Sequence, residues 1–229
     1  MANKVSSPKG SCLLLLLVVS NLLLCKSVSS MSVCPYGDGK CQVPLWEMFQ
    51  RAIHVANYFH ILAAETFSEF EKHYGLGQEF MTMAMNNCHT ASISTPHTKE
   101  EAQKLDTENL LKIIFQLLRS WKDPLNHLVS EVQGVQGITN SISSKTKAIE
   151  EESKRLLEGV EKIIDQVEPG VKESESYSVW LGLPSLQTTD EDSRRLGFYT
   201  VFFCMRRDSS KINSFFKLLY CRIFFQNNC

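Results

Sequence analysis

The sequence lacks the short motifs that mark the common enzyme classes. It has no glycine-rich phosphate loop, no HExxH metalloprotease motif and no GxSxG nucleophile motif. Serine, histidine and aspartate residues are present, but no spacing links them into a catalytic set. We therefore expect a protein that binds a partner and is not an enzyme, and nothing in the sequence calls for a cofactor.

Two structural signals are also missing. No segment alternates apolar and polar residues for long enough to predict a sheet, and no CxxC pair is present, which argues against a zinc site. Beyond the first 30 residues, no apolar run approaches the roughly 20 residues that a membrane-spanning helix needs. The sequence thus predicts an all-α protein without membrane insertion and without a bound metal.

The first 30 residues have the pattern of a secretory signal peptide. Two lysines precede an apolar run at 13–19, and the small residues Val28 and Ser30 end the segment in a pattern suited to cleavage. We therefore expect residues 1–30 to be removed and residues 31–229 to form one secreted, extracellular domain.

Charge is nearly balanced, with 24 basic and 25 acidic side chains. The predicted signal peptide holds three of the lysines and no acidic residue, so the predicted mature chain carries a net charge near −4. Such a chain has no electrostatic reason to bind nucleic acid or an anionic membrane.

Six cysteines lie in the predicted mature chain, and an even number in an oxidising compartment indicates disulfides. One pair encloses a short loop that contains proline and glycine, and another pair closes the end of the chain. The pairs that spacing favours are Cys34–Cys41, Cys221–Cys229 and, by elimination, Cys88–Cys204. A zinc site is the alternative, and the missing CxxC spacing disfavours it.

Four stretches repeat apolar residues at helical spacing. The first follows Pro44 and ends near Tyr74. The second begins at Asp106 and the third at Asn140, where the apolar positions recur every seven residues. The fourth opens at Thr189, which is followed three residues later by an acidic residue, as in a capping box. We also expect a bend where a proline, at position 124, interrupts the second stripe.

The lengths of the connections predict the topology. About 32 residues join the first stretch to the second and about 22 join the third to the fourth, whereas only 134–139 join the second to the third. A helix of roughly 28 residues is about 42 Å long, so a return to its starting end needs on the order of a dozen extended residues. The two long loops can make that return and the short one cannot. This connectivity is the up-up-down-down arrangement of long-chain four-helix cytokine bundles with two long crossover loops. Two separate helical hairpins are the alternative, which a Cys88–Cys204 bond disfavours.

Several blocks of the sequence resemble the prolactin and growth hormone family. They are Phe67-Ser-Glu-Phe-Glu-Lys in the first helix, Arg119-Ser-Trp-Lys-Asp-Pro-Leu in the second, Arg155-Leu-Leu-Glu-Gly in the third, Trp180-Leu-Gly-Leu-Pro-Ser-Leu-Gln in the second crossover and Cys204-Met-Arg-Arg-Asp-Ser in the fourth helix. The resemblance runs from the signal peptide to the last residue. The short amino-terminal disulfide loop favours the prolactin branch, because growth hormones lack it.

The resemblance implies a hormone domain at 31–229 that brings together two copies of a single-pass, prolactin-type receptor, whose associated kinases then signal. It implies a first receptor-binding face on the first helix, the fourth helix and the first crossover, made of Ile53, His60, Phe67, Lys99, Tyr199, Arg206, Arg207, Lys211 and Lys217. A second face would lie on the first and third helices and contain Gln42, Arg155 and Gly159. We expect the hormone itself to be a monomer.

Gly159 is the most informative of these positions. It lies inside a predicted helix, where glycine costs about 1 kcal/mol relative to alanine. Its seven-residue row is polar and flanks the apolar stripe, so packing inside the bundle does not require it. We expect it to leave a notch that a side chain of another protein can enter.

The sequence also departs from its relatives. Asn57 and Ser210 stand where relatives carry histidine, and Asn213 replaces a common acidic residue, so acid-sensitive receptor binding or zinc bridging at these positions is not expected. These changes leave open a diverged placental paralogue with altered receptor preference.

A function of another class, a secreted helical carrier of an apolar ligand or a metal, also stays open.

Overall fold

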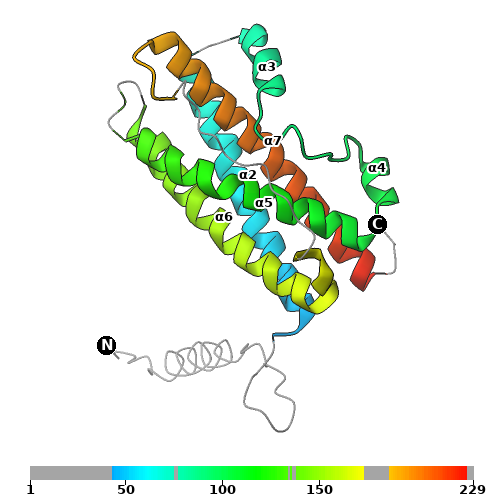
Figure 1. Ribbon diagram of the computed structural model, residues 1–229. Coiled ribbons are helices and arrows are strands. Elements are labelled where there is room, and N and C mark those ends of the chain that lie inside the picture. The colour runs from blue at the N-terminus through cyan, green and yellow to red at the C-terminus, as the bar shows by residue number, and fades with distance from the viewer. Residues whose placement is uncertain (1–42, 75–76, 134, 136–137, 173–185, 226–229) are drawn as a thin grey trace, which may run out of the picture. The chain divides into compact units, whose positions relative to one another are not determined.

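The long helices lie close to where the sequence predicts them. The computed structural model describes residues 43–74, 77–133, 135, 138–172 and 186–225. Its long helices are α2 (Leu45–Tyr74), α5 (Thr107–Glu131), α6 (Asn140–Val167) and α7 (Glu191–Phe224) (Figure 1). Two short helices, α3 (Gly77–Asn86) and α4 (Lys99–Lys104), and the 3-10 turn η1 (Pro169–Lys172) lie in segments that the sequence predicts only as connections. The described residues contain no strand, so the all-α prediction is confirmed for them.

The chain divides into two units, Met1–Pro44 and Leu45–Cys229, and all of these helices belong to the second. None of the helices in the described ranges is long and apolar enough to cross a membrane. The predicted signal peptide, Gln42 and the predicted Cys34–Cys41 and Cys221–Cys229 disulfides involve residues outside the described part of the chain.

Side-chain caps fix where the later helices begin. Asp106 accepts a hydrogen bond from the backbone N–H of Asn109 at 2.7 Å and caps α5, as predicted. The cap of α7 is Asp190, which accepts from the N–H of Ser193 at 2.9 Å, and not the predicted Thr189. Aspartate is the stronger choice because its charge also opposes the positive end of the helix dipole. The helix α5 continues through its buried internal proline, and the bend that we expect there stays a prediction.

The predicted stripes form the core. On α6, the four apolar residues spaced by seven, Ile142, Ile149, Leu156 and Ile163, are all at most 1% exposed. On α5, Trp121 is completely buried. Burying a large apolar side chain contributes about 1.5–3 kcal/mol, so these stripes supply much of the drive for packing.

The helix α7 is buried over more of its circumference than one stripe explains. Every residue from Gly197 to Met205 is buried. The reason is that α7 packs against α2 and α5 on one side, whereas α3 from the first crossover covers another side (Figure 1). The carboxyl-terminal half of α7 contacts α2 and the first crossover, and Ser214 and Lys217 remain exposed on it.

Contacts between helix ends give the direction in which neighbouring helices run. The end of α2 meets the start of α6, where Glu69 accepts hydrogen bonds from Thr139 at 2.7 Å and from Lys145 at 3.1 Å. The start of α2 meets the end of α7, where Gln50 donates to the hydroxyl of Tyr220 at 3.0 Å. In each pair the two helices are therefore antiparallel. The helices α5 and α6 are joined across the short connection between them, where Ser143 donates to the carbonyl oxygen of residue 132 at 3.4 Å.

One disulfide ties the first crossover to α7. Cys88 and Cys204 are bonded, with their Cα atoms 5.7 Å apart and 116 positions apart in the chain, which confirms that predicted pair. Closing a loop of this length removes conformational entropy from the unfolded chain and stabilises the fold by about 4–5 kcal/mol in the chain-entropy model.

Candidate functional site

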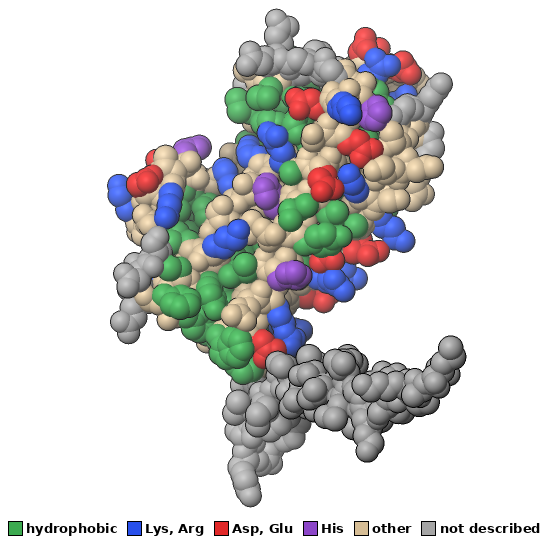
Figure 2. All heavy atoms as spheres, turned by 180° about the vertical axis from the view of Figure 1, so that it is seen from behind, with side chains coloured by type: hydrophobic (Ala, Val, Ile, Leu, Met, Phe, Trp, Pro, Cys, Tyr) green, Lys and Arg blue, Asp and Glu red, His purple; other side chains and the backbone are tan. Residues whose placement is uncertain are grey.

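The residues of the predicted first face do not form one uniform surface. Six of them lie where α2 meets α7, and we call this surface the α2–α7 face: Ile53, His60, Phe67, Tyr199, Arg206 and Lys217. The others, Lys99, Arg207 and Lys211, are associated with the first crossover. On the side of the molecule shown in Figure 2, basic and histidine side chains are interspersed with hydrophobic patches.

Arg206 is the central charged group of the α2–α7 face. Its guanidinium carbon lies 4.4 Å from the centroid of the Phe67 ring and 5.7 Å from that of Phe203. Phe67 also packs edge-on against Tyr199, with the ring centroids 5.2 Å apart. The rings hold the guanidinium by cation–π attraction at a half-buried position, so little side-chain entropy remains to be lost on binding.

Phe67 and Tyr199 themselves are buried, with 1% and 0% of their surface exposed. In this structure they form the floor beneath Arg206, and they present no surface of their own to a partner. Burial also raises the pKa of the Tyr199 hydroxyl, which has no hydrogen-bond partner among the described residues.

His60 lies beside Arg206 and links α2 to α7. Its Nδ1 atom is 3.2 Å from the hydroxyl of Ser209, and that hydroxyl donates its single proton to the carbonyl oxygen of Arg206 at 3.0 Å. The ring nitrogen of His60 must therefore be the donor to Ser209. Burial lowers the pKa of His60, and the positive charges of Lys217 and Arg206 lower it further. The ring is thus held neutral near physiological pH.

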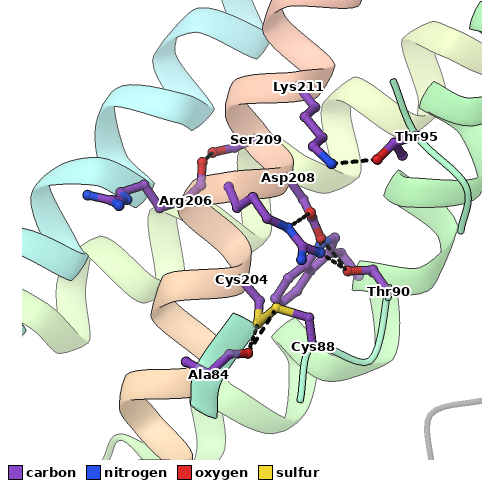
Figure 3. A network of polar contacts seen from close by, with 11 residues as sticks. Ala84, Cys88, Thr90, Thr95, Cys204, Arg206, Asp208, Ser209 and Lys211 are labelled. Carbon is purple, nitrogen blue, oxygen red and sulfur yellow. Dashed lines mark hydrogen bonds and ion pairs between the residues drawn. A yellow bond between two sulfur atoms is a disulfide. The ribbon is translucent and has the colours of Figure 1, made fainter. Parts of the chain in front are cut away.

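Arg207 is half-buried and is hydrogen-bonded to a buried network. Asp208 is 1% exposed, and its carboxylate accepts hydrogen bonds from the indole of Trp121 at 3.0 Å, from the Thr90 hydroxyl at 2.6 Å and from Nε of Arg207 at 2.8 Å. Arg207 donates a further bond to Thr90 at 2.8 Å. Arg206 and Asp208 extend from different sides of α7 (Figure 3).

This network joins three parts of the chain at one point. Thr90 belongs to the first crossover, Trp121 to α5, and Asp208 to α7. The disulfide of Cys204 lies next to it (Figure 3). The ring of His89 packs edge-on against Trp121, with centroids 4.5 Å apart, and its pKa is lowered mainly by burial. The network and the disulfide together fix the first crossover on α7.

Lys211 extends the same attachment toward the carboxyl-terminal half of α7. Its ammonium group donates to the hydroxyl of Thr95 in the first crossover. Burial lowers the pKa of Lys211, and the charge of Arg207 lowers it further. Lys99, the first residue of α4, and Lys217 are both exposed.

The predicted second face contains two described residues, Arg155 and Gly159, both on α6. Arg155 is exposed and pairs with Glu152 on its own helix at 2.9 Å. A Cβ atom built on Gly159 would meet no neighbouring atom within 4 Å. The space beside this half-buried glycine is therefore open, and the notch for a partner's side chain stays a prediction. Gln42 lies outside the described residues.

Two exposed apolar side chains of α2 lie seven and four residues before Glu65, which pairs with Lys145 of α6 at 3.3 Å, and so share its side of the helix. Tyr58 and Ile61 are 46% and 42% exposed. The antiparallel register is fixed by Lys145, which pairs with Glu69 at one end, and by Gln166, whose amide approaches the Met48 sulfur at 3.3 Å at the other. This register places Gly159 opposite Val55, one helical turn from Tyr58.

The contact between Asp208 and Thr90 is not predictable from the sequence, because 118 positions separate the two residues. The only hint in the sequence is Asp208 itself, an acidic residue at a position of α7 where the apolar spacing predicts an apolar residue. For metals, the described residues contain no group of three or more histidine, cysteine and carboxylate side chains able to hold an ion.

The sequence matches the model of a known protein family. The family model described as the Somatotropin hormone family matches residues 17–229. The match covers every helix described above and the whole of both crossovers.

Proposed function

The chain belongs to the somatotropin hormone family, and from this premise we propose that it is a secreted hormone that binds and dimerises a prolactin-type, single-pass receptor to trigger kinase-linked signalling. Family membership supports a hormone that acts on class I cytokine receptors, in a family of signalling proteins and not of enzymes. The observation that carries the proposal is Arg206, a guanidinium held on aromatic rings at the surface where α2 meets α7.

The proposed bundle is up-up-down-down. The antiparallel contacts of α2 with α6 and with α7 support it, as does the short connection that reverses the chain between α5 and α6. In this arrangement α2 and α7 are neighbours. Residues about 150 positions apart in the sequence therefore lie together on the α2–α7 face. Two long crossovers are needed, and the first of them is attached to α7 by the disulfide and the Asp208 network.

The proposed first receptor-binding face centres on Arg206. Arginine is favoured at protein interfaces because its planar guanidinium forms paired hydrogen bonds and stacks on aromatic rings. Here the stacking is already present in the free hormone, so the Arg206 side chain loses little conformational entropy on binding. His60 is linked to it through Ser209, Ile53 and Lys217 lie farther along the same two helices, and the buried Phe67 and Tyr199 act by holding it in place.

The proposed second face lies where α2 meets α6, around Gly159. The open space above this glycine admits a side chain of a second receptor copy, and the exposed Tyr58 and Ile61 offer apolar surface near it. Arg155 adds a charged group to the rim. One monomeric hormone with two such faces would bind two receptor copies.

Two departures from the prolactin pattern touch each other. The amide of Asn213 donates to the side-chain oxygen of Asn57 at 3.3 Å, across the contact between α7 and α2. Relatives carry ionisable residues at these positions, whereas two neutral amides do not titrate. This pair supports a receptor preference that differs from that of prolactin, as expected of a diverged paralogue. In this proposal, a fall in pH would change the charge of the first receptor-binding face mainly by protonating His60.

Secretion follows from the same proposal. Residues 1–30 would be removed as a signal peptide, and residues 31–229 would form the hormone domain. The Cys34–Cys41 and Cys221–Cys229 disulfides would form together with Cys88–Cys204 in the oxidising compartment.

The test is a titration of the secreted protein with prolactin-type and growth-hormone-type receptor ectodomains, with and without zinc. We expect the prolactin-type ectodomain to bind, and Arg206→Gln to weaken binding about thirtyfold, which corresponds to about 2 kcal/mol for an interface hot spot. Arg195→Gln is the matched control, because Arg195 also lies over a ring of α2, that of Tyr74 at 5.7 Å, but outside the proposed face. Binding that is indifferent to Arg206, or as sensitive to Arg195, would contradict the assignment.

A further inference from the structure

A groove of about 490 Å³ lies between the first crossover and the carboxyl-terminal half of α7. The crossover side is formed by residues 96–99 and Ala102 of α4, and the α7 side by residues between 210 and 221. Its size is within the range of small-molecule sites, roughly 300–1,000 Å³.

Hydrogen bonds at both ends of this groove link its two walls and fix the distance between them. At one end, Lys211 donates to the hydroxyl of Thr95. At the other end, the guanidinium of Arg222 donates to the carbonyl oxygens of Leu105 at 2.6 Å and of Gln103 at 3.1 Å. Between these points the crossover spans α7, so the groove is preformed and a ligand would pay little to open it.

The chemistry of the groove is amphipathic. Its floor is apolar, with Ala102 and Phe215 at 4% and 5% exposure and Leu218 beside them. Its rim carries Lys99, Lys211 and Lys217, and none of the described lining residues is acidic. None of the ion pairs of the described residues joins Lys211 or Lys217 to a carboxylate. A positive rim over an apolar floor is complementary to an anionic head with an apolar tail.

We propose that this groove binds a long-chain fatty acid as its anion, with the acyl chain along Phe215 and Leu218 and the carboxylate among the rim lysines. Burial of the chain provides the attraction, because each methylene removed from water contributes about 0.8 kcal/mol. The lysines fix the orientation and select for the anion, since a carboxylate receives charge-assisted hydrogen bonds that an ester cannot.

The inference goes beyond receptor binding and does not rest on it, because the groove can be tested on the hormone alone. If the proposed function also holds, the bound anion occupies Lys99, Lys211 and Lys217 and competes with the receptor for them. Loss of receptor binding in a protein that still binds the fatty acid would count against the proposed function only.

The experiment uses the full secreted protein and the fluorescent fatty acid cis-parinarate below its micellar concentration. We expect saturable binding with one site per chain. Lys217→Gln, at an exposed position, should weaken binding about fivefold, and the double variant with Lys211→Gln about tenfold, as expected for one or two partly exposed charge pairs. The double variant Lys147→Gln and Lys162→Gln is the control, because both lysines are exposed on α6, and it should bind as the parent does.

Two further measurements keep the inference falsifiable if Lys211→Gln disturbs the crossover. Ser214→Trp fills the groove from an exposed position and should abolish binding while the helical circular dichroism stays unchanged. The methyl ester of parinarate should bind at least tenfold more weakly than the acid. Equal binding of acid and ester, an unchanged affinity in Ser214→Trp, unsaturable uptake or binding to anionic vesicles only would overturn the inference.

Discussion

The substitution Asp208→Asn tests most directly how the first crossover is attached to α7. The substitution keeps the size of the side chain and removes its charge. In the parent, three donors converge on two carboxylate oxygens, from Trp121, Thr90 and Arg207. An amide offers only one oxygen, so in either orientation its NH₂ group faces a donor, and at least one buried hydrogen bond is lost.

The cost follows from these contacts. A hydrogen bond to a charged group contributes about 1.5–3 kcal/mol, and a buried donor left without a partner costs about 1–3 kcal/mol. Arg207 is half-buried and regains some hydration, which reduces the charge contribution. We expect a loss of about 3 kcal/mol in the free energy of unfolding, a large part of the roughly 5–15 kcal/mol of a typical domain.

The assay is urea unfolding followed by circular dichroism and by tryptophan fluorescence. A loss of this size lowers the midpoint by about 1–2 M. The control is Asp192→Asn on the same helix, because this carboxylate is 92% exposed and pairs with Arg195 at 3.6 Å, so its loss should cost within about 0.5 kcal/mol. If Asp208→Asn costs less than about 1 kcal/mol, the network does not hold the crossover in the way that the geometry indicates.

Two further predictions concern stability. Gly159→Ala should stabilise the protein by about 0.5–1 kcal/mol, because alanine is the better helix former and its Cβ meets no atom within 4 Å; a lower urea midpoint would contradict the open space seen at this position. Lowering the pH should destabilise the fold, because the pKa values of His60 and His89 are both lowered, mainly by burial. Below the unfolded pKa of about 6.5 the unfolded chain binds protons that the folded chain does not, so the free energy of unfolding falls as the pH falls. Urea midpoints at about pH 7.5 and about pH 5.5 measure this, and a pH dependence that His89→Gln leaves unchanged would remove that residue from the explanation.

The long helices could be predicted because their apolar residues recur at helical spacing over many turns. The stripe that contains Ile142 and Ile163 is almost completely buried, and Asp106 caps α5 as its sequence indicates. The short helices α3 and α4 were not separated out, because few residues in each have a regular apolar repeat, and their position depends on the disulfide that holds the crossover.

The candidate site could be predicted only in part. The resemblance placed Arg206 and Arg207 side by side as surface residues, yet adjacent positions on a helix point in different directions. Arg206 lies on the ring of Phe67, whereas Arg207 turns to Asp208 and Thr90. What each guanidinium contacts depends on the crossover that covers one side of α7, and this contact is not local in sequence.

The central claim is that one hormone uses two faces to bind two receptor copies. The most direct measurement is the mass, by light scattering, of complexes formed with an excess of prolactin-type receptor ectodomain. We predict one hormone with two receptors for the parent, and one hormone with one receptor for Gly159→Arg, whose long side chain fills the space over α6 without disturbing the fold. A two-receptor complex with Gly159→Arg, or no complex with the parent, would contradict the account.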